Sequence, residues 1–291
     1  MRTIVVGYDG SEASSDALAL GVALVDGLGG SLVVAVIDEF HVFAGAPPAG
    51  AERAAYLRET LERASMELGG REFRGETMCG SVPECLELIA ERAGGDLLVI
   101  GSTHRGEAGR VVLGSVGDRL LAGSPCAVAV APSGYAQSRP DHLHRVGVGF
   151  DGEEESREAV RVACDTAVDL GCELLLLAVA PTPVEVLTGI SWGSKSPYLS
   201  FLHEQLNDEL GKASAGLPTN FRFAGEVLDG NPSDVLREKS ADVDLLVLGS
   251  RGYGPLRRVF LGSVSSKVLH GSQCPVLITP RSARGSRVET S

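Results

Sequence analysis

The sequence predicts an α/β fold of two tandem domains, each a five-stranded parallel sheet flanked by helices. Three observations lead to this prediction. The chain has 291 residues, which suggests two domains because one domain averages about 150 residues. Its halves repeat one another, since IVVGYDGSEASSDAL at 4–18 recurs as VGVGFDGEEESREAV at 146–160. Within each half, apolar runs of strand length alternate with amphipathic runs of helix length, the pattern of a parallel sheet covered by helices.

The repeat also predicts where the domains begin and end. Near the end of each half, DLLVIGSTHRGEAGRVVLGS at 96–115 recurs as DLLVLGSRGYGPLRRVFLGS at 244–263. A repeat of about 145 residues is too long for a solenoid unit, so each copy is interpreted as a complete domain. The segment between the copies is polar, and the last residues lack apolar periodicity. We therefore predict domain one at 1–132, a linker at 133–143, domain two at 144–280 and a disordered tail at 281–291.

Each expected strand of domain one is an apolar run, and the third run is the weakest. Alternation of these strands with helices makes the predicted architecture Rossmann-like. The expected strands are TIVVGY (3–8), SLVVAVI (31–37), REFRGETM (71–78), DLLVIGS (96–102) and CAVAVAP (126–132).

The expected helices have their own signals. Ser11 is positioned to cap the first helix of domain one. The third helix of domain two has a cap followed by proline in Asn231-Pro232, and Ser81 with Pro83 is a looser version in domain one. Residues spaced for one face of the second helix form an apolar stripe: Leu57, Leu61, Ala64 and Leu68.

The last strand of each domain predicts how the domains pack. Each of the strands CAVAVAP (126–132) and CPVLITP (274–280) would end a sheet and expose backbone donors and acceptors. Pairing the two edges removes this liability. We therefore expect the domains to pack as a pseudo-twofold pair within one chain.

Composition excludes several classes of partner. A formal net charge of -12 argues against binding of nucleic acid or an anionic membrane surface, since both require a basic surface. The six cysteines form no Cys-x-x-Cys pair, so neither a metal site nor a disulfide framework is predicted. The sequence has no signal-peptide pattern and no apolar run long enough for a membrane span. We expect a cytoplasmic protein.

Ligands of open parallel sheets bind beyond the carboxyl ends of the strands, where two loops part. The first strand of domain one leads to Asp9, and the fourth leads to the glycine-rich segment 101–115. If these strands are neighbours, Asp9 and that segment face one crevice. A carboxylate there suits ribose or base donors, and a glycine loop before a helix suits phosphate. The alternative is that Asp9 only supports the turn and caps the helix.

The corresponding loop of domain two carries the stronger signal. Gly249, Gly252 and Gly262 are spaced so that the backbone can approach an oxygen-rich ligand, and Ser263 can cap the following helix. Residues 249–267 contain four cationic side chains and no acid, whereas the equivalent 101–119 contains three arginines against two acids. The alternative interpretation is a mobile loop with solvated arginines.

The Gly-x2-Gly-x9-Gly-Ser pattern after a fourth strand, with Asp at the end of the first, resembles the nucleotide-binding type of universal stress protein. The resemblance runs through both halves, so the whole chain is similar to the tandem form of that family. It implies ATP with magnesium at the crevice between strands one and four, and association of domains through their last strands. It leaves a homodimer and a protein partner open. Carried over by position, Asp9 and Asp151 would serve the nucleoside, Val36 and Val179 the adenine through their backbones, Gly249, Gly252, Gly262 and Ser263 the phosphates in domain two, and Gly101, Gly114 and Ser115 those in domain one.

Domain one departs from the family pattern at His104, where the motif asks for glycine. A side chain at this point enters the space of the phosphate, so we expect the second site to bind ATP more securely. The alternatives are that a protonated His104 contacts a phosphate, or that Gly106 and Gly109 let the loop take another path. The sequence lacks the Gly-x4-Gly-Lys-Ser/Thr loop of conventional phosphoryl-transfer enzymes. The leading hypothesis is an ATP-binding stress-response or regulatory protein. The alternatives are a weak magnesium-dependent ATPase and a dimerisation module without nucleotide.

Overall fold

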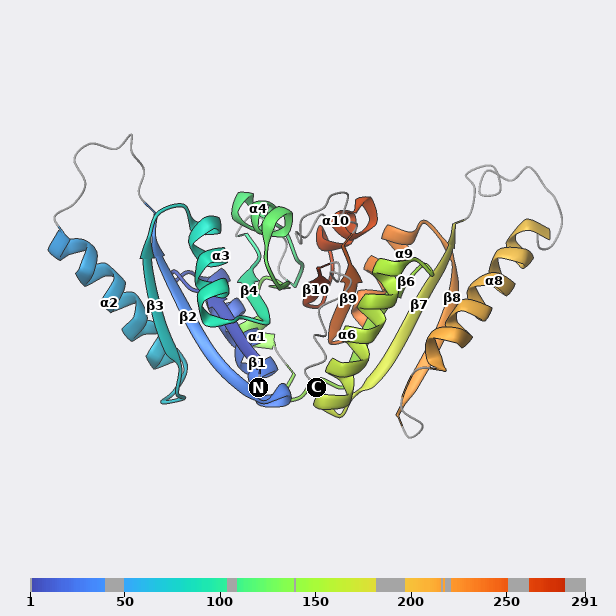
Figure 1. Ribbon diagram of the computed structural model, residues 1–291, viewed down its shortest axis with the longest axis horizontal. Helices are drawn as coiled ribbons and strands as arrows, with labels where there is room; N and C mark the ends of the chain where they lie inside the picture. The colour runs from blue at the N-terminus through green and yellow to red at the C-terminus, as the bar shows by residue number, and fades with distance from the viewer. Residues whose placement is uncertain are drawn as a thin grey trace, which may run out of the picture.

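Figure 1 shows the computed structural model of the chain. The structure describes residues 2–39, 50–103, 109–138, 140–181, 197–215, 217, 221–250 and 262–280. The predicted tail, 281–291, lies outside the described residues. The strands are β1 (Arg2–Gly7), β2 (Gly30–Asp38), β3 (Arg74–Cys79), β4 (Leu97–Gly101), β5 (Ala127–Ala131), β6 (Arg145–Phe150), β7 (Glu173–Pro181), β8 (Phe223–Gly230), β9 (Leu245–Gly249) and β10 (Val276–Thr279). The helices are α1 (Glu12–Leu28), α2 (Gly50–Glu67), α3 (Val82–Ala93), α4 (Ser115–Gly123), α5 (Tyr135–Ser138), α6 (Glu154–Leu170), α8 (Pro197–Ser214), α9 (Pro232–Lys239), the 3-10 turn η1 (Ser240–Asp242) and α10 (Ser263–Leu269).

The strands form one continuous 10-stranded sheet in the order β3-β2-β1-β4-β5-β10-β9-β6-β7-β8. Within each half every pairing is parallel, as predicted for the α/β fold. The halves meet where β5 and β10 pair antiparallel, with Val128 opposite Ile278. The predicted pairing of the two last strands is therefore confirmed, and it merges the two sheets into one.

Two layers of helices cover the sheet, one on each face. Buried side chains from α1, α2, α6 and α8 belong to one apolar cluster, which also contains Ile4 and Val148 from the sheet. Helices α3, α4, α9 and α10 contribute to the cluster on the opposite face. Both clusters contain residues from both halves, so the core is continuous across the antiparallel pairing.

Local signals placed several element ends correctly. Ser11 is the N-cap of α1, and its side chain accepts a hydrogen bond from Ser14 N. Asn231 caps α9 by accepting from Ser233 N, whereas Ser81 makes no such bond at the start of α3. In the predicted stripe Ala64 is fully buried, and Leu57, Leu61 and Leu68 pack against the core, with Leu68 just beyond the end of α2. The third strand begins at Arg74 rather than at residue 71, because its pairing with β2 starts there.

The linker is attached to domain one. Asp16 of α1 is 2% exposed, and its carboxylate accepts hydrogen bonds from the amides of Gly134 at 2.8 Å and Ala136 at 2.7 Å. These donors lie at the start of the short helix α5, whose Tyr135 is buried. A segment predicted from its polarity to be a plain connection is thus docked by a buried carboxylate.

Residues 109–114, in the loop between β4 and α4, form hydrogen bonds to the second half of the chain. Val111 N donates to Ser272 O and Gly271 N donates to Val111 O, each at 2.9 Å. On its other side, Gly109 N donates to Ser133 O of the linker at 2.8 Å. Among the described helices, none combines the length and apolar character that a membrane crossing requires.

Candidate functional site

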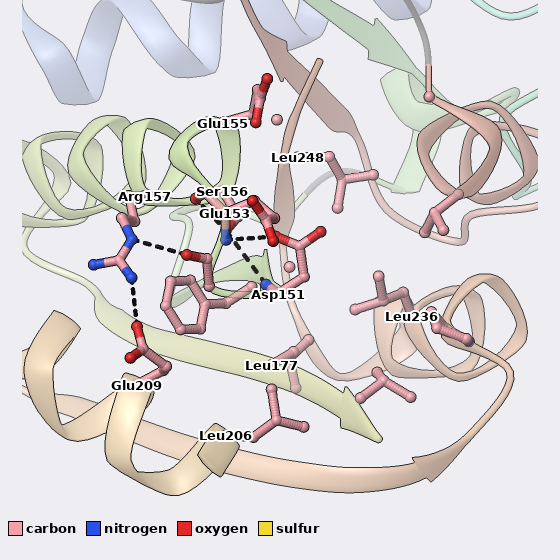
Figure 2. Close-up of a pocket in the computed structure, with 18 of the residues that line it drawn as sticks. Asp151, Glu153, Glu155, Ser156, Arg157, Leu177, Leu206, Glu209, Leu236 and Leu248 are labelled. Carbon is pink, nitrogen blue, oxygen red and sulfur yellow. Dashed lines mark hydrogen bonds and ion pairs between the residues drawn. The ribbon is translucent and has the colours of Figure 1, made fainter. Parts of the chain in front are cut away.

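A cavity of about 720 Å³ opens at the carboxyl ends of β6, β7 and β9 in domain two (Figure 2). Strands β6 and β9 are neighbours, as the crevice hypothesis required. Four residues that the sequence singled out line the cavity: Asp151, Val179, Gly249 and Gly262. Parallel sheets place ligand sites at such strand ends.

Asp151 organises the turn between β6 and α6. Its Oδ1 accepts a hydrogen bond from Glu153 N at 3.1 Å, and Gly152 between them has a φ of +84°. In domain one, Asp9 Oδ1 accepts from Ser11 N at 2.9 Å. Both aspartates therefore support their turns, which is one part of the alternative interpretation of Asp9; the cap of α1 is Ser11 and not Asp9. The exposed carboxylate of Asp151 also lies at the rim of the cavity.

Gly249 ends β9 beside the cavity, and its missing side chain has a structural explanation. A Cβ on Gly249 would lie 2.6 Å from the carbonyl oxygen of Glu155 in α6. In domain one, a Cβ on Gly101 would collide with the carbonyl oxygen of Ala13 in α1. Both glycines allow the helix to approach the strand end closely. The sequence-based interpretation was that glycine at these positions lets a ligand approach the backbone. Close packing of the helix against the strand end also explains why glycine is found there.

The cavity has an apolar floor and a charged rim. Five carboxylates line it among the described residues, against the two cations Arg157 and Lys212. Ser265 Oγ donates to Gly249 O at 3.0 Å and so ties α10 to the end of β9. The floor is formed by aliphatic side chains, among them Leu177, Leu206, Leu236 and Leu248 (Figure 2).

Helix α8 supplies a wall of the cavity. Arg157 Nη2 on α6 and Glu209 Oε2 on α8 form an ion pair at 2.5 Å, and Lys212 Nζ lies 2.7 Å from Glu209 Oε1. The hydrogen bond from Lys212, followed by the charges of Lys212 and Arg157, lowers the pKa of Glu209. The sequence predicted none of these α8 contacts, because an amphipathic helix does not reveal which polar residue faces a cavity.

The equivalent place in domain one has different side chains. Tyr8 Oη and Ser15 Oγ both donate to Glu67 Oε1 of α2, at 2.6 and 3.1 Å. Burial, followed by the hydrogen bond to Glu67, raises the pKa of Tyr8. A Cβ on Gly10 would lie 2.6 Å from Arg63 Nη1, so a guanidinium covers the turn that follows Asp9.

Comparison with family models identifies the group of proteins to which this chain is related. The model described as the universal stress protein family matches residues 1–132 and again residues 142–280. The chain belongs to the universal stress protein family.

Two relatives and one solved structure that this chain resembles are named universal stress proteins. Universal stress protein Rv2005c of Mycobacterium tuberculosis is 36% identical over 207 residues, which cover 69% of this chain and 66% of that protein, just under two thirds of its length. Universal stress protein Rv2319c of the same organism is 29% identical over 301 residues, covering 96% and 99%. A universal stress protein from Archaeoglobus fulgidus matches with a TM-score of 0.68 at 19% identity, covering 96% of this chain and 98% of that one. That structural match supports the fold.

In this universal stress protein, one predicted detail is wrong. Ser263 was expected to cap the last helix, but the N-cap is Gly262, and the exposed Ser263 begins α10. Likewise Gly114 is the N-cap of α4, and the exposed Ser115 is its first residue. Gly252 lies outside the described residues, as does His104.

Val36 and Val179 do not occupy equivalent positions in the two domains of this universal stress protein. Gly7 of β1 lies opposite Ala35, whereas its counterpart Gly149 of β6 lies opposite Leu177. Val36 therefore packs in the cluster that contains α1, and Val179 packs against the cluster on the other face. The adenine contact that the family pattern implies for both stays a prediction.

Proposed function

We propose that this universal stress protein binds ATP in the cavity of domain two, and that nucleotide occupancy regulates its association with a protein partner. The observation that carries the proposal is the cavity of about 720 Å³, lined by four of the residues that the nucleotide-binding motif singles out. Its volume falls within the range of small-molecule sites, about 300–1,000 Å³.

The lining fits the parts of a nucleotide. The aliphatic floor suits the faces of a purine, and the carboxylate of Asp151 suits the hydroxyl donors of a ribose. Phosphates would lie toward Gly249 and Gly262, at the segment in which the sequence places three arginines. Those arginines lie outside the described residues.

Magnesium enters this proposal with the nucleotide. Among the described residues, no group of three or more histidine, cysteine or acidic side chains is placed to hold a metal. The described rim of the cavity carries more acids than bases. A magnesium ion bound to the phosphates would reduce the repulsion between this rim and the polyphosphate.

Domain one would carry a second, weaker site. Asp9, Val36, Gly101, Gly114 and Ser115 are the residues proposed for it. Histidine stands at position 104, where the motif asks for glycine. The proposed order of affinity follows from this difference between the loops.

Equilibrium binding of ATP with magnesium, measured by calorimetry, tests the proposal. We expect Asp151→Ala to weaken the tighter site about ten-fold or more, since a hydrogen bond to a charged group is lost. The matched variant Asp9→Ala should leave the tighter site intact. Because both aspartates support turns, thermal unfolding of each variant must show that the fold is retained.

Three outcomes would contradict the proposal or extend it. If the wild-type chain binds no nucleotide and releases none when denatured, it is a dimerisation module instead. Equal effects of the two alanine variants on the tighter site would contradict its assignment to domain two. Phosphate release above the buffer blank at saturating ATP would add slow hydrolysis to the function.

A further inference from the structure

An ion pair joins α6 and α8, two helices that line the cavity of domain two. Arg157 lies near the start of α6 and Glu209 lies on α8, and their charged groups are 2.5 Å apart (Figure 2). Arg157 Nε also donates to Gly152 O at 2.9 Å, in the turn that follows Asp151. One guanidinium therefore holds both the Asp151 turn and the helix that faces it.

Neighbouring side chains hold the carboxylate of Glu209 in place for this contact. Lys212, one turn further along α8, donates to its second carboxylate oxygen at 2.7 Å. The hydrogen bond from Lys212, with the charges of Lys212 and Arg157, lowers the pKa of Glu209. Glu209 Cγ lies 3.6 Å from the position of a Cβ on Gly152, so α8 approaches the turn closely.

Both side chains of the ion pair are partly exposed to solvent. The side chain of Arg157 is 53% exposed and that of Glu209 is 25% exposed. Charges at such positions are screened, because the Debye length falls from about 10 Å at 0.1 M salt to about 3 Å at 1 M. The contribution of this pair to the position of α8 should therefore fall as ionic strength rises.

Domain one joins the same elements in another way. Ser15 stands at the position that corresponds to Arg157, and it donates a hydroxyl to Glu67 together with the buried Tyr8. Hydroxyl donors carry no charge, so added salt screens these contacts much less than an ion pair. The two sites of one chain therefore differ in how their helical walls are held.

We propose that Arg157 is a positioning residue of the second nucleotide site, and that its ion pair with Glu209 makes the affinity of that site depend on ionic strength. The part that concerns affinity rests on the proposed function. The part that concerns α8 does not need a ligand. Loss of the ion pair lets α8 move away from the Asp151 turn and widens the cavity.

Adenosine is the ligand for the binding test, because it is neutral and its own interactions with the protein are little affected by salt. We expect the wild-type dissociation constant at the second site to rise about three-fold between about 0.05 M and 1 M KCl. Arg157→Ala should bind about three-fold more weakly at low salt and lose the salt dependence. Arg157→Lys keeps a positive charge opposite Glu209, so it should recover part of the affinity and retain the salt dependence.

Arg161→Ala is the matched control. Arg161 lies one turn further along α6 and pairs with Glu158 and Asp165, but it does not line this cavity. This variant should keep the wild-type affinity and salt dependence. Any change equal to that of Arg157→Ala would assign the effect to the stability of α6 and overturn the proposal.

Hydrogen exchange of the α8 amides without ligand separates this proposal from the proposed function. We expect about three-fold faster exchange in α8 for Arg157→Ala than for wild type, and a smaller increase for Arg157→Lys. Unchanged exchange together with unchanged adenosine affinity overturns the role of Arg157 and leaves nucleotide binding in place. Faster α8 exchange in a chain that binds neither adenosine nor ATP overturns the proposed function alone.

Discussion

Replacing Gly249 by alanine should destabilise the protein by about 1–3 kcal/mol, the usual cost of an overpacked site. The new Cβ would lie 2.6 Å from the carbonyl oxygen and 2.8 Å from the carbonyl carbon of Glu155. Both atoms belong to the backbone, so no side-chain rotation relieves the contact. Relief requires α6 and β9 to separate by about 0.5 Å in a close-packed interior.

Neither element can separate easily. Strand β9 is paired on both sides, with β10 and with β6. Helix α6 is held by a buried face that includes Ala159 and Ala163. Gly249 is not among the glycines of positive φ, so the expected cost is steric and not a backbone penalty. Gly101→Ala should cost at least as much, because its Cβ would lie closer still to a backbone oxygen.

Urea unfolding followed by circular dichroism, without nucleotide, measures this effect. Gly211→Ala is the control, because a Cβ there meets nothing within 4 Å. An alanine inside helix α8 should stabilise the chain by about 0.5–1 kcal/mol. A Gly249→Ala variant within about 0.5 kcal/mol of wild type would refute the packing explanation, since surface changes of that size are ordinary. Weakened ATP binding in such a variant would then assign Gly249 to the ligand.

Two further predictions follow from buried polar groups. Asp16→Ala should cost about 1–3 kcal/mol, because it leaves the two amide donors of the linker without their acceptor, and limited proteolysis should cut the linker faster than in wild type. Burial raises the thiol pKa from 9.0 to about 11 for Cys126 and Cys172 and to about 12 for Cys274. The folded state thus favours the neutral thiols. The free energy of unfolding should therefore stay constant below about pH 9 and fall above it, because only the unfolded chain ionises its thiols there. Urea titrations on both sides of about pH 9 measure this change.

Local chemistry made part of the structure predictable. The caps Ser11 and Asn231 act on amides two or three residues away, so sequence spacing alone located them. Pairing of the last strands followed from the exposure of sheet edges, a general property of backbone donors and acceptors. The position of Asp151 beside a cavity followed from the repeat and from the strand-end rule.

Features that depend on tertiary contacts were missed. Strands buried on both faces lack alternation, so the sequence did not show that Val36 and Val179 face opposite sides of the sheet. The contact between Arg157 and Glu209 joins residues far apart in the chain, and no motif marks it. The docked linker was hidden by its polar composition, because its acceptor, Asp16, lies in the first helix.

The antiparallel pairing of β5 and β10 gives each domain a structural role that is independent of any ligand. Domain one must keep its fold to complete the sheet of domain two, even if its own strand-end loop changes. Position 104 carries histidine where the family pattern has glycine, and it lies outside the paired strands β5 and β10. A tandem chain of this kind is therefore free to specialise one domain for binding and keep the other as a structural partner, so a change that would cost a single-domain protein its function can be tolerated here.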